Sequence, residues 1–202
     1  MRILFIDLAH HEGLIACVDG ERVASSECAG NRVSDKDLVP LIEKLLKQAG
    51  WTMKDLGAVA CVTGPGGFTS LKVAVSAANA LAWSLHIPIA GIHGSELVRA
   101  CSTEEDVIWL HSTKKEEMFV CGFGSHVTHW PEPIHRRLEA FASELPPAFS
   151  YIGEVIPEHE AWISEHGGKP ARVVPVEEIL PRFLAPLPYG HDQLTPWYGR
   201  EG

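Results

Sequence analysis

The chain has 202 residues and a formal net charge of −9. This length can bury a sizeable core, either as one domain or as two lobes of roughly 100 residues each. The negative charge would repel the phosphate backbone of a nucleic acid, which excludes an autonomous nucleic-acid binder and leaves any positive surface to a partner.

The first part of the chain predicts three strands, a helix, a strand and a second helix, in that order. Apolar, β-branched residues indicate the strands, and apolar residues at helical spacing indicate the helices. Ser34 and Asp37 form a capping-box pattern at the start of the first helix. The expected bounds are 2–7, 14–19 and 22–27 for the opening meander, 34–49 for the first helix, 57–63 for the next strand and 70–85 for the second helix.

The second half of the chain carries weaker signals. A strand, a helix, two strands, an amphipathic helix, a strand, a helical patch and a last strand are expected, at 88–91, 95–100, 106–110, 117–123, 136–143, 150–153, 158–164 and 171–174. From Pro181 onward, prolines alternate with aromatic residues without a helical or strand period. This tail is predicted to be a loop packed on a surface or a flexible end.

The most informative motif is the loop Gly64-Pro65-Gly66-Gly67-Phe68-Thr69, between a predicted strand and the second helix. Glycine permits positive φ and the close approach of a backbone or a phosphate. Thr69 or Ser70 can cap the helix, whose first N–H groups form an anion site. The loop therefore indicates contact with a nucleotide or a partner, although a tight turn can use the same residues. It is not a Walker loop, because no Gly-Lys-Ser/Thr follows the glycines.

The two helices of the first half are candidates for an association surface. The second helix has a stripe of small apolar residues that would let another helix approach closely, although the stripe can equally face the chain's own sheet. Trp83 and the remaining apolar side of the first helix are harder to bury in one thin lobe. The candidate interface residues are Leu38, Leu41, Ile42, Leu45, Lys72, Val75, Ser76, Asn79 and Trp83.

Neither the cysteines nor the histidines indicate a metal site. The five cysteines are widely spaced and include no C-x-x-C pair, so a disulfide framework or zinc knuckle is not expected. The eleven histidines include no H-x-x-x-H or H-E-x-x-H, and we expect them to be scattered surface or structural residues. With no apolar run near the roughly 20 residues that cross a bilayer, we expect a cytoplasmic protein without a membrane partner.

A family resemblance rests on four motifs: Ile3-Leu4-Phe5-Ile6-Asp7, Leu38-Val39-Pro40-Leu41-Ile42, the run from Gly64 to Val73, and Leu85-His86-Ile87-Pro88-Ile89. Weaker matches follow at 119–120, 152–154 and 181–184. In these motifs the chain resembles the TsaB (YeaZ) family, whose members are partner subunits of the bacterial tRNA threonylcarbamoyladenosine (t6A) synthase. The resemblance covers the whole chain, but only about the first 95 residues are specific.

The resemblance implies an α/β protein of the actin-like, Hsp70-like ATPase (ASKHA) fold: two lobes, each a mixed sheet flanked by helices. The first lobe would be residues 1–95, with the glycine loop and the dimerisation helices. A smaller second lobe, residues 96–202, would end in an irregular tail.

The implied function is that of a non-catalytic accessory subunit, required for threonylcarbamoyl transfer to the adenosine beside the anticodon of tRNAs that read codons beginning with A. The chain would heterodimerise with the catalytic paralogue TsaD and activate it, and a TsaE-type ATPase would dock on the pair. The chain would meet tRNA only within this complex, and either a homodimer or a monomer is compatible with the sequence when the chain is alone.

Three departures from the family pattern concern the nucleotide site. Leu8 stands where the family has Thr, Ser70-Leu71-Lys72 replaces Gly-Leu-Arg, and Ser112 replaces an Asp. Losing a hydroxyl and a carboxylate weakens a Mg-nucleotide site, so Asp7 and the glycine loop would be vestigial. We expect no cofactor of its own, with ATP and Mg bound at most weakly or through partner subunits.

One alternative is a small ATP-dependent phosphotransferase or ATP hydrolase of the same fold, using Asp7 with the glycine loop. A glycoprotease would need a metal pair such as H-x-x-x-H or a G-x-S-x-G elbow, and the sequence has neither.

Overall fold

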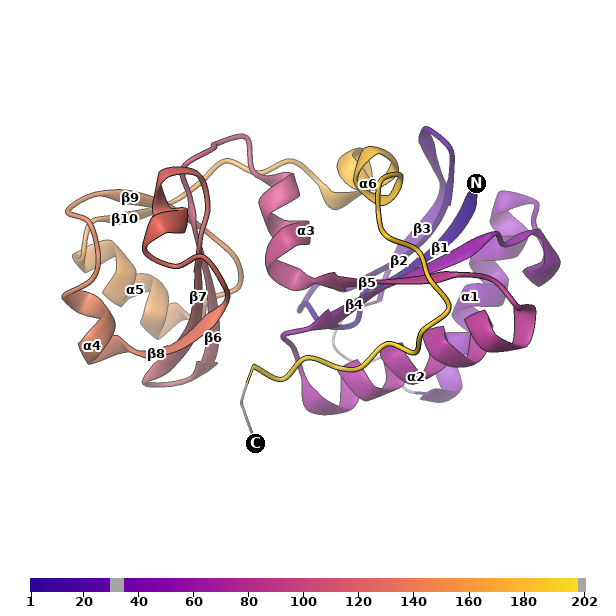
Figure 1. The fold of residues 1–202 in the computed structure, drawn as a ribbon, viewed down its shortest axis with the longest axis horizontal. Coiled ribbons are helices and arrows are strands. Elements are labelled where there is room, and N and C mark those ends of the chain that lie inside the picture. Colours follow the sequence, from indigo (N-terminus) through magenta and orange to yellow (C-terminus); the bar gives the residue numbers. More distant parts are fainter. Residues whose placement is uncertain (30–34, 200–202) are drawn as a thin grey trace. The chain divides into compact units, whose positions relative to one another are not determined.

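The computed structural model describes residues 1–29 and 35–199 and divides the chain into two compact units. Unit 1 contains Met1–Gly94 and Val176–Tyr198, and unit 2 contains Ser95–Pro175 and Gly199. The sequence predicts one lobe up to residue 95 and a second lobe from residue 96 to the end. The structure differs in one respect, because the chain returns to unit 1 at Val176–Tyr198. Figure 1 shows this segment in yellow. The return is explained by the helix α6, Val176–Leu184, which packs against strands of unit 1 and buries three apolar side chains, Ile179, Leu180 and Leu184.

Unit 1 contains a five-stranded mixed sheet with the strand order β3-β2-β1-β4-β5. The strands are β1 Arg2–Ile6, β2 Leu14–Asp19, β3 Arg22–Cys28, β4 Ala58–Gly64 and β5 Ile89–His93. The first three form an antiparallel meander, and β4 runs parallel to both β1 and β5. This is the meander that the sequence predicts.

The helices of unit 1 cover both faces of this sheet. The helices α1 Asp35–Ala49 and α2 Phe68–Leu85 lie on one face and α6 on the other (Figure 1), and a short 3-10 turn, Met53–Asp55, follows α1. Successive strand residues point to opposite faces, so Leu4 and Ile6 join the core beneath α1 and α2 while Phe5 is buried on the other side. The predicted cap Ser34 lies outside the described residues.

Unit 2 contains a second five-stranded sheet, with the order β10-β9-β6-β7-β8. Its strands are β6 Ile108–Lys114, β7 Glu117–Gly122, β8 Ile134–Arg137, β9 Phe149–Ile152 and β10 Gly168–Pro170. The helical segments are α3 Gly94–Cys101, the 3-10 helix Gly124–Thr128, α4 Leu138–Ala142 and α5 Pro157–Glu165.

The two sheets repeat one topology. The order β3-β2-β1-β4-β5 is matched by β8-β7-β6-β9-β10, with an antiparallel meander followed by two parallel strands in each case. The helices recur at corresponding places, since α1 and α4 follow the meanders and α2 and α5 connect the parallel strands. The expectation of two mixed sheets flanked by helices is therefore confirmed.

Three local predictions in the second half were wrong. The helix expected at 136–143 is a strand up to Arg137 and a helix only from Leu138, because His135 and Arg136 pair with β7. The strand expected at 171–174 forms earlier, at Gly168–Pro170, and Val173 makes only an isolated bridge to Ser102. The tail is not irregular from Pro181, since α6 continues through this proline. None of the described helices is long and apolar enough to cross a membrane.

Candidate functional site

The glycine loop joins the end of β4 to the start of α2. Gly64 and Pro65 are buried, whereas Gly67, Phe68 and Thr69 are exposed. The predicted cap by Thr69 or Ser70 is wrong: α2 begins at Phe68, its N-cap is Gly67, and no side chain caps it. The exposed part of the loop is therefore the first turn of α2.

Two glycines of the loop, the buried Gly64 and the half-buried Gly66, are approached by the chain's own backbone. A Cβ at Gly66 would collide with the backbone of Ala9, in the loop after β1, and a Cβ at Gly64 would collide with the carbonyl oxygen of Trp197. Gly64 also has a φ of 141°, which favours glycine. Glycine at these two places is thus explained by protein contacts and does not require a phosphate.

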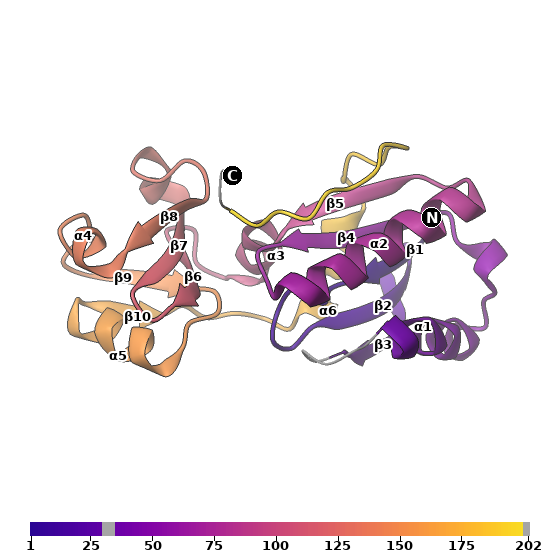
Figure 2. The same cartoon turned by 90° about the horizontal axis from the view of Figure 1, so that it is seen from below.

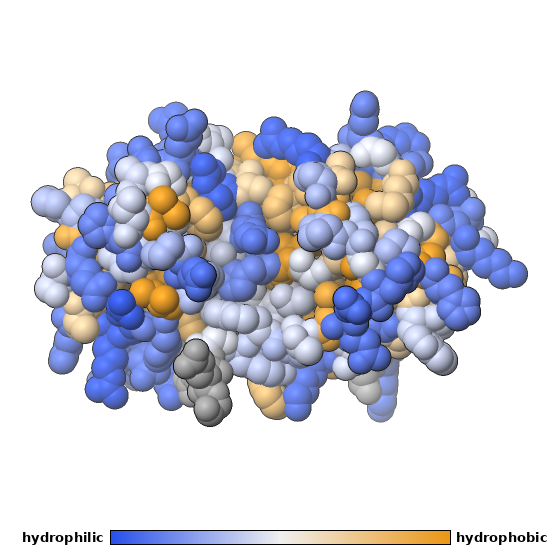
Figure 3. Space-filling view, in the orientation of Figure 1, coloured by the Kyte–Doolittle hydropathy of each residue, from blue (hydrophilic) through white to orange (hydrophobic). Residues whose placement is uncertain are grey.

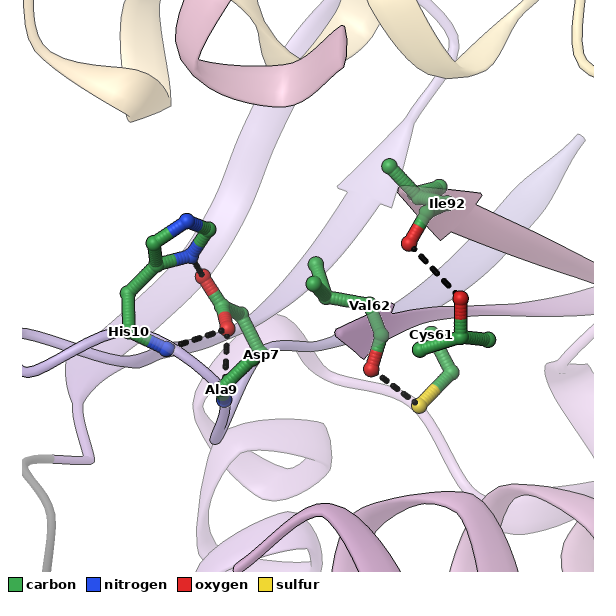
Figure 4. A network of polar contacts seen from close by, with 7 residues as sticks. Asp7, Ala9, His10, Cys61, Val62 and Ile92 are labelled. Carbon is green, nitrogen blue, oxygen red and sulfur yellow. Dashed lines mark hydrogen bonds and ion pairs between the residues drawn. The ribbon is translucent and has the colours of Figure 1, made fainter. Parts of the chain in front are cut away.

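The carboxylate of Asp7 caps the loop that follows β1. Its Oδ1 accepts hydrogen bonds from the backbone N–H groups of Ala9 and His10, at 2.9 and 3.2 Å, and its Oδ2 accepts one from His10 Nδ1 at 2.7 Å (Figure 4). Asp7 is only 4% exposed. Nearby in β4, burial first and the Asp7 charge second raise the pKa of the Cys61 thiol, which keeps this cysteine protonated.

Two features of these residues are unfavourable for a Mg-nucleotide site. Both oxygens of Asp7 already accept hydrogen bonds from its own loop, and Leu8 is packed in the core of unit 1. Hydrated Mg²⁺ needs several oxygen ligands in octahedral geometry. Among the described residues, no group of three or more His, Cys, Asp or Glu side chains could hold a metal ion.

His93, at the end of β5, lies beside this loop. Its ring meets the ring of Trp197 edge-on, with centroids 4.5 Å apart. Burial, with a smaller effect from nearby His10, lowers the pKa of His93 to about 4. His93 is therefore neutral at physiological pH.

The candidate interface residues differ in how far they are buried in unit 1. Four of them, Leu38, Ile42, Leu45 and Val75, are buried in the core of unit 1, because they face its sheet, and so they cannot form an interface. Leu41 packs partly against the same core. Lys72, Ser76 and Trp83 are exposed, and Asn79 is half-buried and hydrogen-bonded to the C-terminal segment. The structure therefore keeps only the outer residues of α2 as surface candidates.

An apolar surface does run over α1 and α2. Val39, Phe68 and Trp83 are 47%, 60% and 76% exposed. Between the helices is a shallow hollow of about 410 Å³, lined by Leu38, Val39, Lys72, Val73, Ser76 and Ala77. Figure 3 shows the side of the molecule seen in Figure 1, where orange apolar residues lie among blue hydrophilic ones. We call the exposed and half-buried residues Val39, Phe68, Lys72, Val73, Ser76, Ala77 and Trp83 the α1–α2 face; Leu38 lies buried beneath it.

Sequence reasoning missed Val39, Phe68, Val73 and Ala77 as parts of this face. The available signal was the helical angle: Val39 follows the buried Leu38, and a step of one residue turns a side chain about 100° around the helix. An apolar side chain that points about 100° away from the buried side of its helix is not covered by the sheet.

In unit 2, Ser112 has a structural role. Its hydroxyl donates to Nδ1 of His159 at 2.8 Å and accepts the backbone N–H of Ile156 at 2.9 Å. His159 is fully buried, and its Nε2 donates to the carbonyl oxygen of Lys115 at 2.9 Å. The pair thus joins β6 to the start of α5.

Comparison with known proteins gives matches to two related kinds of protein. The family model that matches residues 30–128 describes TsaD, the tRNA N6-adenosine threonylcarbamoyltransferase. The enzyme of that name from Bordetella pertussis is 49% identical over 59 residues, which are 29% of this chain and 17% of that protein. The chain thus matches only about a sixth of the length of this relative.

Two further relatives carry the name tRNA threonylcarbamoyladenosine biosynthesis protein TsaB. The Buchnera aphidicola protein is 46% identical over 55 residues, which are 27% of this chain and 26% of that protein. The Escherichia coli protein is 24% identical over 159 residues, which cover 71% of this chain and 69% of that protein. The longer alignment is therefore with TsaB.

Two solved structures share the whole fold. A Pseudomonas aeruginosa protein described as similar to peptidase YEAZ has a TM-score of 0.71 at 17% identity and covers 98% of this chain and 99% of its own. YeaZ from the same organism has a TM-score of 0.65 at 16% identity, covering 97% and 99%. With the repeated sheet topology, these matches confirm the predicted fold of two mixed sheets flanked by helices, which this chain shares with the two Pseudomonas aeruginosa structures.

Proposed function

The chain resembles the TsaB (YeaZ) family, and on that premise we propose that it is an accessory subunit in the synthesis of t6A in tRNA. In this proposal it heterodimerises with a TsaD-type catalytic paralogue and activates it, and a TsaE-type ATPase joins the pair. The chain itself carries out no chemistry and works in the cytoplasm.

The α1–α2 face supports this proposal most strongly. Large apolar side chains on a folded surface, with polar side chains around them, mark protein–protein interaction sites. Trp83 is 76% exposed although α2 packs its own inner side fully against the sheet. Tryptophan is the residue type most enriched among those that dominate binding energy. We infer that Trp83 and Val39 are anchors for the partner subunit.

The contacts of Asp7 within its own loop and the net charge of the chain favour an accessory subunit over an enzyme. The Asp7 carboxylate is engaged by its own loop, which leaves the phosphotransferase alternative without its metal-binding group. The sequence lacks the H-x-x-x-H pair of the catalytic paralogue. A net charge of −9 leaves the binding of tRNA to the other subunits. We propose that ATP and Mg reach the complex through those subunits, and that the α1–α2 face forms a homodimer when the partner is absent.

The test uses one substitution on the face and one control. Trp83→Glu places a charge in the proposed contact while the exposed position leaves the fold intact. The control, Gln48→Glu, adds the same charge at an exposed position of α1, one helical turn after Lys44. Lys44 forms an ion pair with Glu27 of β3, so this side of α1 lies away from the hollow.

Affinity for the host's TsaD-type paralogue is measured by isothermal titration calorimetry. We expect Trp83→Glu to weaken binding at least about tenfold, because interface tryptophans dominate binding energy, and Gln48→Glu to bind like the wild type. Equal affinity for Trp83→Glu and the wild type would overturn the proposed face.

A further inference from the structure

The C-terminal segment Leu194–Tyr198 lies on unit 1 and is held there by main-chain hydrogen bonds; we call it the strap. Both backbone groups of Leu194 bind the side-chain amide of Asn79 in α2: Asn79 Nδ2 donates to the Leu194 oxygen, and the Leu194 N–H donates to Asn79 Oδ1, each at 2.9 Å. The N–H of Trp197 donates to the carbonyl oxygen of Thr63, at the end of β4, at 2.8 Å. Figures 1 and 2 show the yellow chain beside β5 and α2.

The strap contacts the glycine loop at two places. At the start of the loop, the Trp197 carbonyl lies so close to Gly64 that no Cβ would fit, and the Trp197 ring packs edge-on against His93. Near the end of the loop, the ring of Tyr198 lies 5.1 Å from that of Phe68, the first residue of α2. The strap therefore occupies the space that an incoming group would need to approach the start of the loop.

Two glycines of unit 1 are shaped to receive the strap. Gly64 allows the approach of Trp197, as described above. A Cβ at Gly91 of β5 would come within 3.0 Å of the Leu194 side chain, a tighter contact than is normal. Just before the strap, Gly190 pairs antiparallel with Ile89, so the chain also covers the edge of β5.

The attachment is local. The strap forms no helix or strand, and its side chains are partly or largely exposed, with Leu194 packed against the edge of the unit 1 core. The backbone of Leu194 is bonded to the side chain of Asn79, and the N–H of Trp197 is bonded to the carbonyl oxygen of Thr63. Segments with few buried apolar contacts open at lower free energy than core strands, without global unfolding. Unit 1 can thus lose the strap and keep its sheet.

We propose that the strap is a latch: it closes the start of the glycine loop, it detaches as one unit, and the start of the loop is exposed to solvent only in the detached state. This inference does not depend on the proposed function. It assigns a conformational role to Asn79, which holds the strap and is no part of the α1–α2 face.

Native-state amide hydrogen exchange on the full chain, followed by NMR in low denaturant, tests the latch. We expect the amides of Leu194 and Trp197 to exchange at least about tenfold faster than those of Phe5 and Ala60 in the core strands, and with little dependence on denaturant, because they open locally. The same rate and the same denaturant dependence at all four amides would show that the strap leaves only on global unfolding and would overturn the proposal.

Asn79→Ala tests whether the strap detaches as a unit, with Ser76→Ala, on the outer surface of the same helix, as the control. The informative amide is that of Trp197, which Asn79 does not touch. We expect its exchange to accelerate about tenfold or more in Asn79→Ala alone, with Phe5 and Ala60 unchanged. No acceleration at Trp197, or equal acceleration at Phe5 and Ala60, would overturn the cooperative latch.

The same variant tests the closure of the loop. When the strap detaches, His93 loses its Trp197 cover, so its pKa in an NMR titration should rise from about 4 toward its ordinary 6.5 in Asn79→Ala. An unchanged His93 pKa in a variant whose Trp197 amide exchanges faster would show that the loop stays covered, and would contradict the closure.

Discussion

At the scale of single residues, burial decides what the ionisable groups around the glycine loop can do. Asp7 stands at the end of β1, the position from which a carboxylate could hold a metal ion, yet it is directed into its own loop. His93 is kept neutral by its cover. The hydrogen bonds of Asp7 and the burial of His93 thus belong to the packing of unit 1.

Asp7→Ala should destabilise the protein without affecting its proposed partner role. The change leaves two buried N–H groups and the His10 ring without their acceptor, which costs about 2–4 kcal/mol of unfolding free energy in urea. Glu12→Ala, an exposed change in the same loop, should cost little. Complex-dependent tRNA modification, measured where the variant is still folded, should stay nearly intact. A loss of modification with an intact complex would instead assign a chemical role to Asp7.

His93 makes the stability of the protein depend on pH. Its pKa is about 4 in the folded state against an ordinary 6.5, so the unfolded chain binds the proton more readily. Stability from this group is complete above pH 6.5 and falls as the pH drops from 6.5 toward 4, by up to about 3 kcal/mol. Urea unfolding at pH 7 and pH 5 should show a smaller loss in His93→Gln than in the wild type. Equal losses in the two proteins would contradict this assignment.

At the scale of elements, helical period identifies the inner side of each helix but not what lies on the outside. The stripe of α2 was predicted with two alternatives, a partner or the chain's own sheet, and comprised Leu71, Ala74, Val75, Ala78, Leu81, Ala82 and Leu85. In the structure five of these residues are buried in unit 1, and Leu81 and Leu85 pack partly against the same core. Val39 and Asn79 could not be assigned from spacing. The exposure of Val39 depends on where α1 sits against α2, and the bonds of Asn79 join it to Leu194, 115 residues away.

A pair of neighbouring substitutions separates the two sides of α2. Val75→Glu would bury an unpaired carboxylate in the core of unit 1 and should lower the unfolding free energy by about 3 kcal/mol or more. Ser76→Glu places the same side chain on the exposed side and should leave stability within about 0.5 kcal/mol of the wild type. Thermal unfolding followed by circular dichroism compares them. A stable Val75→Glu protein would contradict the burial of this stripe.

At the scale of the whole molecule, the chain is two copies of one sheet topology with a C-terminal return. The family resemblance implied the two mixed sheets, and strand and helix periods, which are local signals, predicted most of the individual elements. The return of Val176–Tyr198 to unit 1 was not predictable in this way. It depends on α6 packing against β2 and β3 and on bonds between residues far apart in the chain, such as Trp197 and Thr63.

The most direct measurement is size-exclusion chromatography with light scattering on the chain mixed with its host's TsaD-type paralogue, followed by a tRNA modification assay with and without the chain. We predict a stable complex whose modification activity depends on a chain that is inert alone and does not bind tRNA alone, as its charge of −9 indicates. The absence of a complex, or ATP turnover by the isolated chain, would contradict the accessory-subunit function.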